Sequence, residues 1–575
     1  MIKNNDKILV LPDAVKKKIA AGEVIEGPFS IIKELLENSI DGGATEIEVQ
    51  VTGSGLNRIL IKDNGRGISK EDMPLAIVEH ATSKITDIFD IEKISTFGFR
   101  GEALSSISSV SELTILSRRF DEETGSKLKS TSDGVEISDY AGPYGTAVIA
   151  ENLFYNIPAR KKFLKSLNAE MRLIRNIFLK TAISNFNISF SLDSENKRQI
   201  TLKNVSTIKE RLAQIFGLEE IDSLLFSELQ DIKVRISGFL SKPDKMKSSR
   251  NMQYIFINGR PVDYKNLGFM LSKSYEAVAL HGTYPAAFIF IEIDPTLVDV
   301  NIHPSKREVK LFDQRYIDSL IFKLAEKVLN REHNISLKKN DAEKTEPVII
   351  NENNSKLNFS TESDTQRHFF SEHSFSSNSI KDEISQFSNT GIDYKILGIL
   401  FKTYILVEDG DSLAVIDFHA AHERIIFDKL ISRKIDLSPQ SLMFPKTIEL
   451  PIDEYISAVE NINLFLESGI EIEDLSDNRI SVKTMPSVFR EKDPEDIIKD
   501  MIRIFNQEEK PDIFKAVSST SACRLAKKAG DELSMNESAI IAEEILSGSY
   551  ELRCPHGRPF VYRLNKPELE KMFKR

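Results

Sequence analysis

The chain has 575 residues, of which 41% are hydrophobic and 28% charged, so we expect roughly two to four domains of the soluble globular class. The net charge of −11 is unlike that of a nucleic-acid coat protein, although a local basic face can still bind a polyanion. Two cysteines exclude a disulfide scaffold. No signal-peptide core and no apolar run of membrane-spanning length occur, so we expect a cytoplasmic location without membrane association.

Composition divides the chain into a dense N-terminal region, a polar connector and a C-terminal region. Alternating strand and helix signals fill residues 1 to about 331. Residues 332–390 are rich in Ser and Asn and show no sustained helical or strand period, which predicts a disordered linker. Order resumes with two β-branched runs around the turn EDGD at 408–411, which predicts a hairpin followed by a helix.

The segment GPFSIIKELLENSIDGGA at 27–44 predicts an amphipathic helix that begins near Pro28 and ends at two glycines. Glu34 and Asn38 lie one turn apart on a flank outside the apolar arc. A carboxylate followed one turn later by an amide can position a water molecule and hold Mg²⁺ through an oxygen. By themselves such residues are most typical of a solvated helix face.

Three later segments favour a nucleotide site. A strand ends at Asp63, whose carboxylate can accept a hydrogen bond from an adenine amino group, and Gly65 and Gly67 let the backbone approach a base. The glycines of STFGFRGEAL precede a helix start, where backbone N–H groups bind phosphate oxygens. The further candidate nucleotide contacts are Thr82, Ser83, Lys84, Gly98, Phe99, Arg100, Gly101 and Thr146.

In this order, the segments resemble the ATPase superfamily of gyrase, heat-shock chaperones, histidine kinases and MutL proteins, and no P-loop motif is present. Seven motifs resemble the MutL branch: IAAGEVIEGP (19–28), KELLENSIDGGAT (33–45), DNGRGI (63–68), HATSKI (80–85), GFRGEAL (98–104), LFYNIPARKKF (153–163) and VDVNIHPSKREV (298–309). By this resemblance Glu34 is the general base, Asn38 the Mg²⁺ ligand of bound ATP and Asp63 the adenine-reading carboxylate. Lys306 is the lysine that reaches the γ-phosphate from a second domain.

The resemblance implies a multidomain α+β fold. It comprises an N-terminal α/β sandwich of the Bergerat (GHKL) type at 1–208, a second α/β domain of the ribosomal S5 type at 209–331, the linker at 332–390 and an α/β dimerisation domain at 391–575. By resemblance Arg260, in the segment NGR, contacts DNA. Arg160, Lys161, Lys162 and Lys165 form a basic helix start, which is more typical of a solvated surface.

The C-terminal region contains residues typical of a metal site. His419 and Glu423 are spaced i, i+4, so they share one helix face. Such a pair alone is more typical of an exposed helix contact, but the only two cysteines fall in similar sequence, SACR and CPHGRP. The candidate ligands are Asp417, His419, Glu423, Cys523, Cys554 and His556.

The segments DFHAAHERIIFD, SACR, CPHGRP and the terminal MFKR resemble the endonuclease motifs of MutL proteins that nick DNA. The resemblance implies Zn²⁺ on the His, Glu and Cys residues, and a catalytic Mn²⁺ or Mg²⁺ near Asp417 that activates water. Phe418 and Asp428 replace the family's usual Gln and Glu, and the aromatic ring of Phe418, beside the ligands, is the main risk to the predicted nuclease activity.

The hexapeptide QSLMFP resembles the peptide with which MutL proteins dock on the sliding clamp, although a strand entering a domain would look the same. Its docking residues would be Gln440, Leu442, Met443, Phe444 and Pro445. The other partners that the resemblance implies are the mismatch sensor MutS, double- and single-stranded DNA and a second copy of the chain.

Two functional hypotheses remain open from the sequence. The first is an ATPase with a latent endonuclease, and the second is an ATP-switched matchmaker that cuts nothing. A gyrase-like topoisomerase subunit would need a second acidic metal domain with a DxD-type cluster, which is absent. A histidine kinase would need a phosphoacceptor helix, and only about 20 residues precede the ATPase motifs.

Overall fold

The structure is a computed structural model, and in it the chain folds into two compact units. The first comprises Met1–Lys339 and Glu449–Ile456, and the second Asn340–Ile448 and Ser457–Arg575. The residues that the structure describes are 24–84, 97–98, 101–231, 233–247, 250–279, 283–299, 310–342, 394–432, 437–476, 478–489, 492–507, 512–527, 533–548, 550–555 and 558–572.

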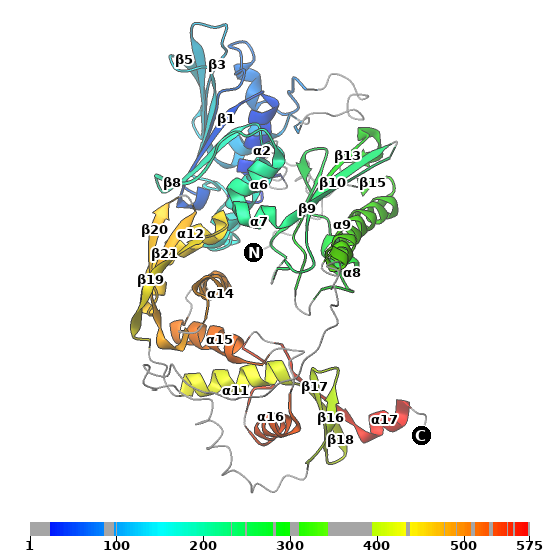
Figure 1. The fold of residues 1–575 in the computed structure, drawn as a ribbon. Helices are drawn as coiled ribbons and strands as arrows, with labels where there is room; N and C mark the ends of the chain where they lie inside the picture. Colours follow the sequence, from blue (N-terminus) through cyan, green and yellow to red (C-terminus); the bar gives the residue numbers. More distant parts are fainter. Residues whose placement is uncertain are drawn as a thin grey trace, which may run out of the picture. The chain divides into compact units, whose positions relative to one another are not determined.

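An eight-stranded sheet forms the N-terminal part of the first unit, in the order β5-β4-β3-β6-β2-β1-β7-β8 (Figure 1). Only β1 and β7 pair in parallel among these neighbours, and the other pairs are antiparallel. The strands are β1 (Glu46–Thr52), β2 (Arg58–Asp63), β3 (Glu112–Arg118), β4 (Gly125–Thr131), β5 (Gly134–Tyr140), β6 (Gly145–Glu151), β7 (Ser189–Ser194) and β8 (Lys197–Leu202).

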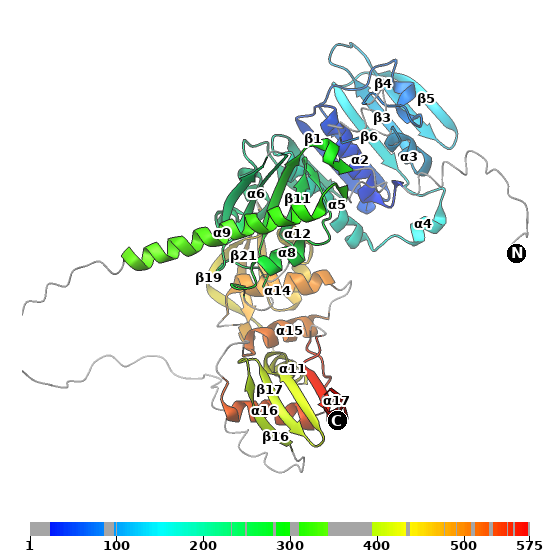
Figure 2. The same cartoon turned by 90° about the vertical axis from the view of Figure 1, so that its right-hand side faces the viewer.

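A layer of helices packs on this sheet, so the predicted α/β sandwich is confirmed (Figure 2). α2 (Pro28–Asp41) contacts both α3 (Ala103–Val110) and α5 (Leu167–Ser184). Its start at Pro28 and its C-cap at Gly42 are those predicted. The apolar arc explains its place, because Ile31, Ile32, Leu35 and Leu36 are almost completely buried in the core shared with the sheet.

A second, five-stranded sheet follows, in the order β12-β11-β13-β10-β9, with its own hydrophobic core. Its strands are β9 (Leu224–Gln230), β10 (Val234–Ser241), β11 (Gln253–Ile257), β12 (Arg260–Pro261) and β13 (Ala287–Ile293). α8 (Leu267–Ser274) and α9 (Gln314–Ala342) pack in this core, and α7 (Leu218–Asp222) contacts β9. α6 (Ile208–Phe216) contacts α5 and β8 and packs in the core of the first sheet.

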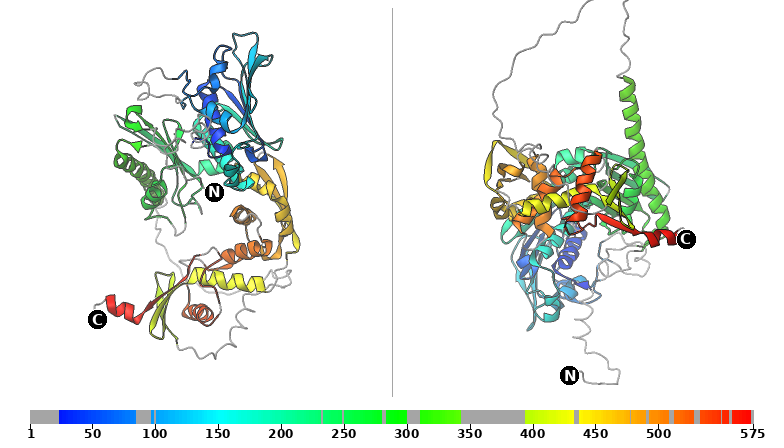
Figure 3. Two further views of the ribbon diagram at one scale, coloured as in Figure 1. Left: turned by 180° about the vertical axis from the view of Figure 1, so that it is seen from behind. Right: turned by 90° about the horizontal axis from the view of Figure 1, so that it is seen from below.

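α9 is one long helix, drawn in green in Figure 3, and it continues to Ala342, past the position 332 at which we expect the linker to begin. The rest of the predicted linker, 343–390, lies outside the described residues.

The second unit begins with the predicted hairpin, in which β17 pairs antiparallel with β18 around the turn at Gly410. The sheet β16-β17-β18-β22 contains β16 (Tyr394–Leu400), β17 (Tyr404–Asp409), β18 (Ser412–Asp417) and β22 (Val561–Asn565). It packs with α11 (Phe418–Ser432) and α16 (Met535–Ser547), while α11 also contacts α15 (Ile513–Leu525).

A three-stranded sheet, in the order β19-β21-β20, completes this region. Its strands are β19 (Pro439–Glu449), β20 (Glu471–Ser476) and β21 (Arg479–Pro486), and the neighbouring helices are α12 (Ile452–Glu460), α13 (Ile462–Glu467) and α14 (Pro494–Gln507). α17 (Lys566–Met572) follows β22. Across the described parts of the chain, no helix has both the length and the apolar character needed to cross a bilayer.

Candidate functional site

Glu34 does not lie on a solvated face. Its side chain, on the flank of α2, is only 11% exposed, and the ammonium of Lys33 lies 3.4 Å from its Oε1. Asn38, one turn later, is half-buried. An ionisable side chain is rarely buried in this way without a partner or a function, so the burial favours the interpretation as a site residue.

Lys84 brings a cation to Asn38. Its Nζ donates to Oδ1 of Asn38 at 3.0 Å and to Oδ2 of Asp41 at 2.6 Å. The side-chain oxygen of Asn38, the predicted Mg²⁺ ligand, is therefore already paired with a positive charge. Binding of Mg²⁺ at this oxygen requires the ammonium of Lys84 to move aside or to share it.

Asp41 binds the predicted phosphate loop, the segment around Gly98 and Gly101, to the end of α2, and Lys84 belongs to the predicted lid segment at 80–85. The N–H groups of Phe97 and Gly98 each donate to its carboxylate at 2.9 Å, and its side chain is 4% exposed. A Cβ on Gly98 would lie 2.8 Å from Nζ of Lys84, so a larger residue would crowd this junction. Charge-assisted hydrogen bonds of this kind are among the stronger polar contacts in proteins.

Asp63 ends β2 with both carboxylate oxygens engaged. The hydroxyl of Ser39 donates to Oδ2 at 2.8 Å and the N–H of Gly65 donates to Oδ1 at 2.9 Å. Burial raises the pKa of Asp63 above its usual value, against the opposing effect of these hydrogen bonds and of one from the backbone of Thr146. Each carboxylate oxygen has a second lone pair, so the group can still accept a hydrogen bond from a base.

Two glycines allow close approach of the backbone around this site. Gly67 has φ +75°, and a Cβ there would lie 2.4 Å from the carbonyl oxygen of Arg118. Gly101 has φ +66°, and a Cβ there would lie 2.4 Å from the carbonyl oxygen of Ala81. The N–H of His80 also donates to the carbonyl oxygen of Gly101 (3.1 Å), so the lid segment is joined directly to the phosphate loop.

The structure therefore brings together several predicted residues from α2, the lid and the loops after β2 and before α3. Thr82 lies in the same lid segment, where its Oγ1 accepts from the N–H of Lys84 at 3.2 Å. Thr146 pairs with Asp63 across β6 and β2. Phe99, Arg100 and Lys306 lie outside the described residues, so the roles expected of them stay predictions.

Arg260, the predicted DNA contact, lies against the phosphate loop. Its guanidinium is 5.0 Å from the ring centroid of Phe97, the residue before Gly98, which is cation–π distance. Arg160, in contrast, donates to the carbonyl oxygen of Ile25 at 2.9 Å, whereas Lys161 is exposed. The basic helix start α4 (Pro158–Lys162) therefore uses its arginine for a structural contact.

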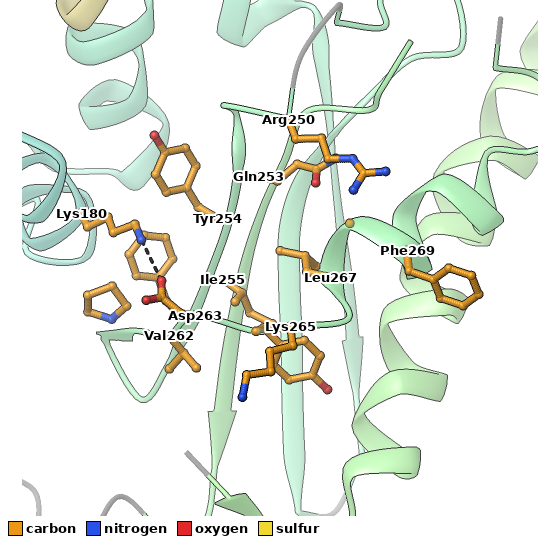
Figure 4. A pocket seen from close by; sticks show the side chains of 14 residues that line it. Lys180, Arg250, Gln253, Tyr254, Ile255, Val262, Asp263, Lys265, Leu267 and Phe269 are labelled. Carbon is orange, nitrogen blue, oxygen red and sulfur yellow. Dashed lines mark hydrogen bonds and ion pairs between the residues drawn. The ribbon is translucent and has the colours of Figure 1, made fainter. Parts of the chain in front are cut away.

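A cavity of about 450 Å³ lies beside the residues that follow Arg260 (Figure 4). β11, the chain after β12 and the start of α8 form its wall, and an ion pair between Lys180 and Asp263 (3.0 Å) lies at its edge. Arg250 and Lys265 add positive charge to the lining. None of the predicted nucleotide contacts in the described ranges lines this cavity.

At the start of α11, Asp417 caps the helix. Its Oδ1 accepts from the N–H of His419 at 3.1 Å and from that of Ala420 at 3.2 Å, as an N-cap aspartate does. Nδ1 of His419 lies 2.6 Å from the carbonyl oxygen of Lys527, so this nitrogen carries the proton and donates it. Nε2 of His419 is then the nitrogen with a lone pair, and this arrangement is common for metal-binding histidines.

Two further predicted ligands lie on adjacent helices. Glu423, one turn after His419, is 4% exposed, and Cys523 is on α15, which packs against α11. Burial, with the nearby Glu423 carboxylate, raises the pKa of Cys523 to about 11. This thiol is therefore protonated at neutral pH, and a bound metal ion would be needed to hold it as thiolate.

The remaining candidates do not complete a metal site among the residues described. Cys554 is buried in the hydrophobic core of this unit, and its neighbour His556 is outside the described ranges. Within those ranges no three His, Cys, Asp or Glu side chains are grouped so that one ion could bind them all. The predicted set of ligands is thus only partly brought together, on α11 and α15.

The predicted docking peptide is an exposed part of β19, which lies at the edge of its sheet. Met443 is 91% exposed and Phe444 78%, while Gln440 and Pro445 are also exposed and Leu442 is half-buried. Large apolar side chains that are this exposed on an edge strand are available for pairing with a partner.

Comparison with known proteins decides the family. Residues 26–139 match the family described as "Histidine kinase-, DNA gyrase B-, and HSP90-like ATPase", residues 212–330 match "DNA mismatch repair protein, C-terminal domain" and residues 397–533 match "MutL C terminal dimerisation domain". The DNA mismatch repair protein MutL of Endomicrobium trichonymphae is 33% identical, over 99% of this chain and 100% of its own length. That of Coxiella burnetii is 34% identical, over 98% and 99%.

The chain belongs to the MutL family of DNA mismatch repair proteins. The solved structures that resemble it include one titled "Aquifex aeolicus MutL ATPase domain complexed with ADP", with 28% identity, a TM-score of 0.38 and coverage of 53% of this chain and 98% of that one. Another is titled "Crystal Structure of N terminal domain of a DNA repair protein", with 26% identity, a TM-score of 0.49 and coverage of 55% and 98%.

Membership in the MutL family confirms several predictions. The chain carries a GHKL-type ATPase domain that binds ATP, for which Mg²⁺ is the usual ion, and it acts in DNA mismatch repair. Its C-terminal region is the family's dimerisation domain, which supports the predicted homodimer.

The two departures from the MutL nuclease motif have defined places in the structure. The side chain of Phe418 is completely buried and packs in the hydrophobic core of its unit, to which Cys554 also belongs, so the effect of its ring on access to the ligands stays a prediction. The alternation of side chains at the end of β18 explains this burial, because a residue next to an outward-facing one points to the opposite side of the sheet. Asp428 forms an ion pair with Arg424, at 2.8 Å, on the same helix.

The sequence analysis missed two residues, Asp41 at the nucleotide site and His422 beside the predicted metal ligands. Asp41 could have been noticed because a carboxylate in the last turn of a helix faces the negative end of the helix dipole, which is unfavourable without another role. His422 lies one turn after His419, and its Nδ1 accepts from the N–H of Lys527 (3.3 Å). Burial lowers the pKa of His422, so it is neutral with its proton on Nε2, the opposite tautomer to His419.

Proposed function

We propose that this MutL-family protein is an ATP-driven DNA clamp and matchmaker, which links mismatch recognition to later steps of repair. The observation that supports the switch most directly is the network around Asp41, because it joins α2, the lid lysine Lys84 and the phosphate loop. Any rearrangement of these contacts by Mg·ATP changes the phosphate loop, and Arg260 of the second domain stacks on that loop at Phe97. ATP occupancy and DNA contact are thereby coupled.

The nucleotide chemistry follows from the same residues. Glu34 accepts a proton from water as the water oxygen attacks the γ-phosphorus, and the bond from phosphorus to the β–γ bridging oxygen breaks to release ADP. Asn38 would hold the Mg²⁺ that offsets the charge of the phosphates, Asp63 would accept a hydrogen bond from the adenine amino group, and Lys306 would offset charge on the transferred group. Two copies joined through the C-terminal domain would close around DNA when both N-terminal regions bind ATP.

Retention on circular DNA tests the clamp. The full chain should remain on a closed circular plasmid through a high-salt wash when loaded with a non-hydrolysable ATP analogue, and should be released when the plasmid is linearised. Equal loss from circular and linear DNA would contradict the clamp. Arg260→Ala should weaken loading in the same assay, whereas Arg160→Lys, at an arginine that contacts Ile25, serves as the matched control for a changed arginine.

We also propose a latent, metal-dependent nicking endonuclease in the C-terminal domain. His419 presents Nε2, Glu423 lies one turn away on the buried side of α11, and Cys523 projects from the adjacent helix, which is a donor set suited to Zn²⁺. With Cys554 and His556 these residues would hold the zinc, and Asp417 would serve a weaker Mn²⁺ or Mg²⁺ that activates water. The second candidate function is the matchmaker that cuts nothing, which the sequence leaves open beside the nuclease.

Partners complete the proposal. The exposed Met443 and Phe444 on the edge strand β19 support docking of this peptide in the apolar pocket of a sliding clamp. A mismatch sensor of the MutS type would deliver the chain to DNA.

Nicking of supercoiled plasmid in Mn²⁺, with and without the sliding clamp, separates the two candidate functions, because a pure matchmaker leaves the plasmid closed in both.

A further inference from the structure

We propose that Lys33 is a positioning residue for ATP hydrolysis, which fixes the carboxylate of Glu34 and is itself held by Glu37. This inference rests on the proposed role of Glu34 as the general base. It begins from three charged groups on one flank of α2 that are all nearly buried. The side chains of Lys33, Glu34 and Glu37 are 9%, 11% and 10% exposed.

The ammonium of Lys33 lies between the two carboxylates. Its Nζ is 3.4 Å from Oε1 of Glu34, to which it donates a hydrogen bond, and 3.1 Å from Oε1 of Glu37. A glutamate on a helix has three rotatable side-chain bonds, so without partners its carboxylate samples several positions. Pairing with a buried ammonium limits the carboxylate of Glu34 to orientations in which Oε1 stays near Nζ.

Glu37 allows Glu34 to remain a proton acceptor beside the positive charge of Lys33. If Lys33 faced Glu34 alone, its positive charge would stabilise the carboxylate and make Glu34 a poorer proton acceptor. With Glu37 at the shorter distance, the ammonium is shared. When Glu34 accepts the proton from the attacking water it becomes neutral, and Lys33 and Glu37 remain as a balanced pair. The ammonium of Lys33 therefore keeps a carboxylate partner throughout, and the cost of an uncompensated buried charge is avoided.

The alternative is an ordinary helix-stabilising pair, and the chain offers one for comparison. Lys499 and Glu495 on α14 have the same i, i+4 spacing in the reverse order, at 2.8 Å, but are 32% and 40% exposed. Exposed pairs of this kind contribute little to stability. A purely structural Lys33 would affect folding or nucleotide binding, whereas a positioning Lys33 affects turnover at unchanged nucleotide affinity.

Steady-state ATP hydrolysis and nucleotide binding by the full chain test the proposal. Lys33→Met should lower kcat by about tenfold or more, since small displacements of a catalytic group are costly. KM for ATP and the affinity for a non-hydrolysable analogue should stay within about twofold. Lys33→Arg, which retains the cation, should recover most of the rate, and Glu37→Gln should lower kcat by a smaller factor at unchanged KM. The matched control Lys499→Met should leave both constants unchanged.

Each outcome decides the inference. Wild-type kcat in Lys33→Met overturns it, and so does a loss of nucleotide affinity in parallel with kcat, because that is the signature of a structural role. If Lys33→Met does not fold, Glu37→Gln decides, and an unchanged kcat there rejects the proposal. Glu34→Ala separates this inference from the function on which it rests. Turnover in Glu34→Ala removes the base itself, whereas an inactive Glu34→Ala beside a fully active Lys33→Met removes only the role of Lys33.

Discussion

The nucleotide region and the C-terminal ligand region differ in what holds them together. In the first, polar groups from separate motifs bond to one another: Ser39 to Asp63, Lys84 to Asn38, and the phosphate loop to Asp41. In the second, Asp417 caps its own helix and His419 bonds to a backbone carbonyl. Protein contacts thus organise the nucleotide site before any ligand binds, whereas the predicted C-terminal ligands are not joined to one another by protein contacts of this kind.

The largest expected effect is the loss of ATP turnover on removing Glu34 from the nucleotide site, whose other contacts form without a ligand. Glu34→Ala should lower ATP turnover by about 10²–10⁴-fold, the usual loss on removing a general base. Nucleotide affinity should persist, because Asp63, Asp41 and the phosphate loop keep their contacts. Turnover measured under saturating ATP, alongside binding of a fluorescent analogue, checks this. Asn38→Ala is the contrasting variant, and it should lose Mg-dependent binding.

In the C-terminal region we expect a loss of nicking activity about as large as the loss of ATP turnover in Glu34→Ala. Asp417→Asn should reduce Mn²⁺-stimulated plasmid nicking by about two orders of magnitude, as expected when an active-site metal centre is disabled. Folding should be preserved, because asparagine caps a helix about as well as aspartate. Zinc content, measured by elemental analysis, should be normal in Asp417→Asn and reduced in Cys523→Ser. Zinc-free protein whose Asp417→Asn variant nicks as well as wild type would leave this domain as a dimeriser and matchmaker.

Asp41 tests how far the nucleotide site depends on contacts within the protein. Asp41→Asn keeps the size of the side chain but loses the charge that Lys84 and two backbone N–H groups share. Nucleotide affinity should fall by about tenfold or more, corresponding to the loss of one charge-assisted hydrogen bond. Calorimetric titration with the analogue measures it. Unchanged affinity would mean that the ligand, and not Asp41, orders the phosphate loop.

The smallest effect should come from the docking peptide, because it touches neither site. Gln440→Ala combined with Phe444→Ala should weaken binding to the sliding clamp by about tenfold, the effect of removing an aromatic anchor from an interface. ATP turnover should be unchanged. Surface-bound clamp titrated with the full chain gives the affinity. If the affinity stays at the wild-type value, this segment is simply an edge strand.

Local signals fixed much of the fold in advance. The helix from Pro28 to Gly42, the strand ending at Asp63 and the hairpin at Gly410 were all foreseeable, because proline, glycine and side-chain periodicity act within a few residues. The candidate residues of the nucleotide site were foreseeable for another reason. Their order along the chain resembles one family, and the comparisons confirm that family.

Other features required the tertiary structure. The burial of Phe418 and the joining of the phosphate loop to Asp41 depend on elements distant in sequence. Helical periodicity shows which residues share a face, but not whether another element covers that face.

Two lysine–glutamate pairs show this limit most clearly. By sequence spacing alone, Lys33 with Glu37 and Glu495 with Lys499 are both lysine–glutamate pairs four positions apart, in opposite order along the chain, and each is typical of a solvated helix face. The sequence by itself determined that both pairs have helical spacing, so that their charges can meet on a helix. Packing of α2 against the sheet and its neighbouring helices decided that one pair is buried and the other exposed. Burial removes water from between charges and strengthens their interaction, so only the tertiary structure sets one pair beside the buried carboxylate of Glu34, the predicted general base.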